Sequence, residues 1–365
     1  MRKRYAALGI AAVLLVLGST GYVARGMQLY HQYHAEFTNY NLPCGTFITW
    51  SPPGVLFTGL YVNQPGLLTL RYRSPQPQTL RITVSIPQFT MPQSLELQAA
   101  PAFQNQTFKP PLLSDSVLDA LVGPGERRAQ IQLQVQTASG DLICNTTAPL
   151  LLKSRQWMRW HDPTLGIDNT PYLAGWVTPD TEAIHTLIGR TSHWLQAHPG
   201  VYPHVSSLFG YNLGQATPDQ VREQVDAIFD TLQNVYHVTY ANDNIPFSTD
   251  SEQIIQLPQD ILSSSYPTGM CVETTAIMAS AVEALGMRPY FIIIPGHAFL
   301  GVALGADPAS PIDYWETSDL NGTAVHGDQA NIDGKAEYAQ AFSKGQIVEV
   351  VDVQFEREQG IIPIE

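Results

Sequence analysis

One stretch of the chain, residues 269–302, limits the possible folds more than any other; it reads GMCVETTAIMASAVEALGMRPYFIIIPGHAFLGV. Its segment 272–285 is apolar nearly all round and rich in alanine, which predicts a buried, closely packed helix. Gly286 is a natural C-terminal stop for this helix. Two strand-like runs, RPYFIII and AFLGVAL, follow on either side of the interruption PGH. A helix followed by strands predicts an α+β domain.

Two further helices are predicted before this stretch. The sequence TPDTEAIHTLIGRTSHWLQ begins one of them, with Thr178 or Asp180 as its cap. TPDQVREQVDAIFDTLQNVYHVTY forms the other, because its apolar residues recur at helical spacing: Val221, Val225, Ile228, Phe229 and Leu232. We therefore expect the α+β domain to cover residues 171–365, after a tryptophan-rich connector at 156–170.

Residues 41–155 have the pattern of an all-β domain. LLTLRYR and TLRITVSI alternate apolar and polar residues, and AQIQLQVQTASGDLIC predicts two strands around a turn. Cys44 and Cys144 bracket the region, and we expect them to form a disulfide. Closing a loop of this length would stabilise the region by roughly 4–5 kcal/mol in the chain-entropy model. These features predict an immunoglobulin-like β-sandwich.

The N-terminal segment 1–27 has the pattern of a membrane anchor. A basic start, MRKR, is followed by about 20 uncharged residues, which is long enough to cross a bilayer as a helix. The basic flank predicts a single-pass anchor with the bulk of the chain outside the cytoplasm, reached through a stalk at 28–40. A cleaved signal peptide is the alternative. The remaining chain carries 15 basic and 32 acidic residues, which argues against nucleic-acid binding.

Cys271 is the odd cysteine once Cys44 and Cys144 are paired. It stands at or near the start of the alanine-rich helix, where free backbone N–H groups and the helix dipole favour a thiolate. The same N–H groups can hold an oxyanion. A reactive nucleophile, an intermolecular disulfide partner and a buried inert thiol are the three interpretations.

His297 and an acid after it complete a candidate triad. His297 is predicted to start the second of two neighbouring strands, from which an imidazole can reach a thiol as general base. Glu316 follows a tryptophan on the next strand and could orient the imidazole, with Asp319 as the alternative and Asp313 just before. A turn histidine bonded to backbone and a solvated acid are the structural alternatives. The ordered set Cys271, His297 and Glu316 is a stronger signal than any one of them.

These segments, GMCVETTAIMASAVEALGMRPYFIIIPGHAFLGV followed by YWETSDL, resemble the transglutaminase-like superfamily of papain-like cysteine enzymes. The resemblance covers about residues 170–365. It implies a papain-like α+β core and acyl chemistry at amide bonds by Cys271, His297 and an acid. The family's acid is usually aspartate, whereas Glu316 stands here. The chemistry needs no metal, no calcium-binding loop is found, and no cofactor is expected.

The sequence thus predicts an extracytoplasmic, membrane-anchored cysteine enzyme acting on a peptide, protein or cell-wall peptide. Water as acyl acceptor would give hydrolysis, and an amine would give cross-linking. The alternative is a catalytically inactive module of the same fold that binds or scaffolds at the cell surface.

Overall fold

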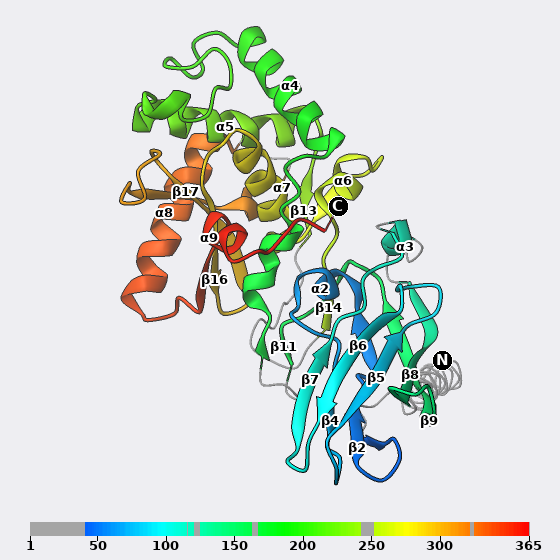
Figure 1. Ribbon diagram of the computed structural model, residues 1–365. Helices are drawn as coiled ribbons and strands as arrows, with labels where there is room; N and C mark the ends of the chain where they lie inside the picture. The colour runs from blue at the N-terminus through cyan, green and yellow to red at the C-terminus, as the bar shows by residue number, and fades with distance from the viewer. Residues whose placement is uncertain are drawn as a thin grey trace, which may run out of the picture. The chain divides into compact units, whose positions relative to one another are not determined.

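The computed structural model describes residues 41–114, 116–119, 125–162, 167–241, 252–321 and 325–364 (Figure 1). The segments 1–27 and 28–40, for which an anchor and a stalk are predicted, lie outside the described residues. The chain divides into two compact units. The first comprises the chain up to Leu56, Pro65–Val117 and Glu126–Leu152, and the second comprises Phe57–Gln64, Leu118–Gly125 and Lys153–Glu365.

Two β-sheets build the first unit, in the region where a β-sandwich is predicted (Figure 1). The four-stranded sheet has the order β1 (Leu42–Pro43), β2 (Ile48–Ser51), β4 (Leu68–Tyr72), β7 (Gln104–Phe108). The five-stranded sheet has the order β3 (Val55–Phe57), β9 (Leu142–Lys153), β8 (Glu126–Thr137), β5 (Gln78–Ser85), β6 (Gln93–Ala99). The short helix α3 (Ser116–Asp119) precedes β8.

The core of the first unit follows the period-two pattern of its strands. Alternate residues are fully or almost fully buried on β4, β5 and β8: Leu68, Leu70, Leu80, Ile82, Val84, Ile131, Leu133 and Val135. Each strand therefore turns one face to the core and one to solvent. The predicted disulfide is present and joins Cys44, between β1 and β2, to Cys144 on β9, so it ties the two sheets together across 100 residues of chain.

The predicted fold class needs one correction, which concerns the transmembrane helix. In the part of the chain that the structure describes, no helix is both long and apolar enough to span a membrane. The apolar helix α7 (Cys271–Ala284) has 14 residues, short of the roughly 20 that a bilayer requires. The described residues form an α+β protein, and the residues of α7 are buried in its core.

The second unit has a four-stranded antiparallel sheet with helices packed on it. The strand order is β18 (Ile312–Trp315), β17 (His297–Ala303), β16 (Pro289–Ile294), β19 (Glu349–Asp352). The helices are α2 (Thr58–Asn63), α4 (Glu182–Ala197), α5 (Pro218–Asn234), α6 (Pro258–Leu262), α7, α8 (Gly327–Ser343) and α9 (Val353–Glu358). Helix α7 packs on β16 and β17, and α8 packs on β18 and α5 (Figure 1).

Short elements complete this unit. Three small strand pairs are formed by β10 (Trp157–Arg159) with β14 (Glu252–Ile254), β11 (His161–Asp162) with β12 (Ile167–Asp168), and β13 (Thr239–Tyr240) with β15 (Thr268–Gly269). The 3₁₀ helices are η1 (Thr170–Trp176), η2 (Asn212–Gly214) and η3 (Thr317–Asp319). The predicted connector, residues 156–170, thus contributes strands to the second unit.

The helices predicted from periodicity are confirmed, with one error at a helix start. The five apolar residues of α5 named above are all fully buried. Gly286 follows α7 with a positive φ of 71°, the left-handed conformation of a C-terminal stop. The N-cap of α4, however, is Thr181. Neither of the two expected caps, Thr178 and Asp180, is therefore the N-cap. Thr178 is buried, and its backbone N–H donates to the Ser280 hydroxyl on α7.

Candidate active site

Cys271 is the first residue of α7 and is 1% exposed. The chain before it is held in place by the buried carboxylate of Glu273, which accepts hydrogen bonds from the backbone N–H groups of Met270 (2.8 Å) and Gln256 (2.7 Å). The parallel pair β13–β15 ends two residues before Cys271. The thiol therefore stands on a fixed helix N-terminus, where backbone N–H groups lack helical partners.

His297 is the first residue of β17 and faces Ile294, the last residue of β16. Pro295 and Gly296 form the two-residue turn between these strands, and Gly296 has a φ of 75°. Proline followed by a glycine at positive φ is the pattern of a type II turn. This turn fixes the histidine at the end of a hairpin, as the sequence predicts.

The Glu316 carboxylate lies against the His297 ring. Nε2 of His297 is 2.9 Å and 3.0 Å from the two carboxylate oxygens of Glu316. The Ser318 backbone N–H also donates to Glu316 (2.9 Å), and Glu316 is 5% exposed. Since Nε2 is bound to Glu316, Nδ1 is the ring nitrogen left for hydrogen bonding to Cys271. The three predicted residues therefore lie together as one series, in which His297 hydrogen-bonds to Glu316 and interacts electrostatically with Cys271.

The electrostatics of the series favour a charged imidazolium. Burial disfavours that charge, but hydrogen bonds and opposite charge from Cys271 and Glu316 raise the pKa of His297 to about 10. Burial would likewise raise the pKa of Glu316, but the hydrogen bond and charge of His297, together with the Ser318 N–H, lower it. An anionic Glu316 beside a cationic His297 is the arrangement that fixes an imidazole for proton transfer to and from sulfur.

The two alternative acids lie elsewhere. Asp319 is the last residue of η3, and one of its carboxylate oxygens is buried without a hydrogen-bond partner. Burial, with the nearby acids Glu316 and Asp333, raises the pKa of Asp319 to about 6. Asp313 forms ion pairs with Arg222 and with Lys335. The structure thus brings Glu316 to the imidazole and gives the other two acids different partners.

Several residues that position the site escape the sequence analysis. The Thr317 hydroxyl lies 3.1 Å and 3.0 Å from the hydroxyls of Thr274 and Thr275 on α7, so the chain after Glu316 is tied to the helix of Cys271. Two adjacent threonines inside an otherwise apolar helix are a signal that a buried polar partner is needed.

Trp315 is fully buried, and its indole N–H donates to Asp226 on α5 (2.7 Å). Its indole thus anchors the end of β18 to α5, immediately before the candidate acid. Nothing in the local sequence around Asp226 indicates this contact, because the two residues are 89 positions apart.

A second glutamate, Glu337 on α8, adjoins the same site. Within the described ranges, His297, Glu316 and Glu337 are a group whose potential ligand atoms all lie within 4.8 Å of one another. These atoms are of the kinds that bind divalent cations. His297 and Glu316 also pair directly with each other, and the charges of both act on Glu337. The absence of a metal or cofactor therefore stays a prediction from the sequence.

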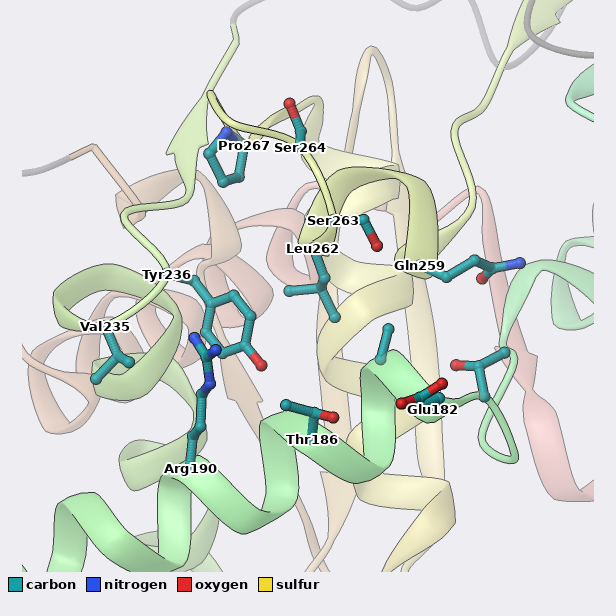
Figure 2. Close-up of a pocket in the computed structure, with 12 residues that line it drawn as sticks. Glu182, Thr186, Arg190, Val235, Tyr236, Gln259, Leu262, Ser263, Ser264 and Pro267 are labelled. Carbon is teal, nitrogen blue, oxygen red and sulfur yellow. The ribbon is translucent and has the colours of Figure 1, made fainter.

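A pocket with a volume of about 650 Å³ opens between α4, α6 and the end of α5 (Figure 2). Arg190 lies over the Tyr236 ring at 4.7 Å, and Glu182, Thr186 and Ser264 contribute polar groups to its wall. Its lining includes Pro267, near the start of α7, but not Cys271, His297 or Glu316. The pocket is thus separate from the candidate catalytic residues.

Comparisons with known proteins give no further assignment. No protein-family model matches the chain, and no curated protein matches it.

Proposed function

We propose that this protein is a transglutaminase-like cysteine enzyme that transfers or hydrolyses acyl groups at amide bonds of peptides or proteins, including cell-wall peptides. The observation that carries the proposal is the series Cys271–His297–Glu316, in which the imidazole hydrogen-bonds to a buried carboxylate and interacts with a sulfur at a helix N-terminus. Each member comes from a different element, and a buried cysteine with no chemical role needs neither a charged imidazole nor a buried carboxylate behind it.

The geometry supports a two-step reaction. The Cys271 sulfur attacks the amide carbonyl carbon, and the Cys271 backbone N–H stabilises the oxyanion that forms. The carbon–nitrogen bond then breaks as the His297 imidazolium gives its proton to the leaving amine, which leaves an acyl thioester. Water or an amine next attacks the thioester carbon and loses its proton to His297, and the thiolate is released. Glu316 keeps the imidazole oriented throughout.

The disulfide Cys44–Cys144 supports action outside the cytoplasm. Disulfides persist in oxidising compartments and are rare in the reducing cytosol. A substrate at the cell surface would fit this placement.

The first experiment measures the pH dependence of Cys271 alkylation by iodoacetamide in the full-length protein. Cys271 is the free cysteine, so mass spectrometry can follow its modification directly. We expect alkylation to persist near pH 6, where an ordinary thiol is more than 99% protonated, and His297→Ala to abolish that reactivity. His185→Ala, at an exposed position on α4, is the matched control and should change nothing.

The opposite result is equally clear. If Cys271 of the wild-type protein reacts only as pH approaches about 8.5 and ignores His297→Ala, the enzyme proposal is wrong. A catalytically inactive binding module would then take its place. If the pair is reactive, incubation with amide-containing peptides, with and without a primary amine, distinguishes hydrolysis from cross-linking by the mass of the product.

A further inference from the structure

Helix α8 is docked directly on the strand that carries the candidate acid. The backbone N–H of Glu316 donates to the carbonyl of Ala330 on α8 (2.9 Å). A Cβ atom added at Gly334 would lie 2.7 Å from the Tyr314 carbonyl oxygen, so the two backbones meet at a glycine. The rings of Tyr314 and Tyr338 stack at 3.9 Å beside this contact. The position of α8 relative to Glu316 is therefore fixed on both sides of Gly334.

This docking brings Glu337, one helical turn beyond Gly334, close to the candidate acid. Glu337, Glu316 and His297 lie with their polar atoms within 4.8 Å of one another. Two carboxylates this close do not both ionise readily, so the pair retains a proton to higher pH than a single carboxyl would. Burial and then the charge of Glu316 raise the pKa of Glu337, while the charge of His297 acts in the opposite direction.

We propose that Glu337 is a positioning residue of the Cys271–His297–Glu316 triad, sharing a proton with Glu316 and, once that proton is lost, placing a second negative charge beside the imidazolium. In the protonated form, Glu337 donates to Glu316 and holds it against His297. In the ionised form, it helps to keep His297 protonated. This inference rests on the proposed function. It adds a fourth residue, which keeps the imidazole protonated over a wider pH range.

The other titratable groups around Glu337 come from β17, the end of β18, η3, α7 and α8 itself. His297 faces it from β17 and Glu316 from the end of β18. Burial, followed by the charges of Glu316, Asp333 and Glu337, raises the pKa of Asp319 on η3; Asp333 lies one turn before Glu337 on α8. Cys271 on α7 interacts with the imidazole. The imidazolium is thus the positive centre of an acidic surrounding, so neutralising one carboxylate has a predictable sign.

The test compares Glu337→Gln, Glu337→Ala and the control Asp328→Asn, which neutralises an exposed acid in the first turn of the same helix. The readouts are the pH titration of the His297 ring by NMR, assigned with His297→Ala, and the alkylation of Cys271. Glutamine still donates to Glu316 but cannot ionise. We therefore expect Glu337→Gln to lower the pKa of His297 by about one pH unit and to leave Cys271 alkylation near pH 6 intact.

Glu337→Ala removes the donor as well as the charge. It should lower the pKa of His297 in the same way and also slow Cys271 alkylation near pH 6 by about three- to tenfold, the worth of one hydrogen bond. Asp328→Asn should leave both readouts unchanged. A positioning carboxyl thus predicts that Glu337→Gln keeps the wild-type alkylation rate, which Glu337→Ala loses, whereas both variants lower the pKa of His297.

A purely structural Glu337 would give another pattern. Wild-type-like histidine titration in both Glu337 variants overturns the inference, even if alanine lowers the melting temperature. That outcome leaves the proposed function standing, because wild-type Cys271 would still react near pH 6. If wild-type Cys271 itself behaves as an ordinary thiol, the proposed function fails independently of Glu337.

Discussion

Gly334→Ala tests the contact that sets the position of α8 against the candidate acid. A Cβ atom at residue 334 would lie 2.7 Å from the backbone nitrogen of Trp315 and from the backbone carbon and oxygen of Tyr314. Ordinary contacts between heavy atoms are about 3.5–4.0 Å, so the helix or the strand must shift by about 1 Å. Both partners are backbone atoms, and no side-chain rotation can relieve the clash.

The magnitude follows from two opposing terms. Over-packing of this kind costs about 1–3 kcal/mol, and contact with immobile backbone favours the upper end. Alanine in a helix interior recovers about 1 kcal/mol relative to glycine. We therefore expect Gly334→Ala to lower the free energy of unfolding by about 2 kcal/mol. The matched control is Gly189→Ala on α4, where a Cβ atom would meet nothing within 4 Å and should stabilise the protein by up to about 1 kcal/mol.

Scanning calorimetry and Cys271 alkylation together give the readout. Gly334→Ala should lower the melting temperature by about 4–8 °C, whereas Gly189→Ala should raise it slightly. The first variant should also weaken alkylation near pH 6, because the shift moves Glu316 away from His297. If both glycine variants are equally stabilised and Cys271 reacts as in the wild type, the close docking of α8 on β18 is wrong.

Three further perturbations test other parts of the structure. Burial raises the pKa of Asp226 to about 8. The folded state thus holds a proton that the unfolded state releases. The stability that results is full below about pH 4 and is lost as pH rises through 8. In melting scans at several pH values, the stability of Asp226→Asn should fall less with pH and should exceed that of the wild type at pH 8 by a few kcal/mol. Lys153 is 1% exposed and paired with Glu252, so Glu252→Gln should cost about 3 kcal/mol in denaturant unfolding and adding Lys153→Met should recover part of it. Replacing Cys44 and Cys144 by serine should lower the stability of the β-sheet unit by about 2–5 kcal/mol, as reductant should in the wild type.

Each of these expectations has a contrary outcome. An Asp226→Asn variant with an unchanged pH profile would mean that the buried carboxyl does not titrate in this range. A double variant at 153 and 252 no more stable than Glu252→Gln would show that the cost does not come from removing the carboxylate partner of Lys153. Serine variants as stable as the wild type would show that the two sheets hold together without the cross-link.

Local patterns in the sequence predicted the elements that carry the site. The spacing of apolar residues on α5, the apolar alanine-rich run of α7 and the turn before His297 each depend on neighbours within a few positions. Such short-range rules of helix, strand and turn need no knowledge of the rest of the fold. The same local reasoning failed at the N-cap of α4, where several neighbouring residues were equally suitable. The transmembrane helix expected in residues 1–27, outside the described residues, has no counterpart among the described helices.

Tertiary structure alone decided which distant groups meet. The sequence offered Glu316 and Asp319 three residues apart, and only the end of β18 and the start of η3 place the first of them against His297. Asp226 and Glu337 carried no local signal, because their partners lie on other elements. Their positions follow from how α5 and α8 pack on β18, with Gly334 allowing the closest approach. Burial at those contacts also sets the protonation of the carboxyl groups, because the pKa of a carboxylate removed from water depends on the charges and hydrogen bonds around it.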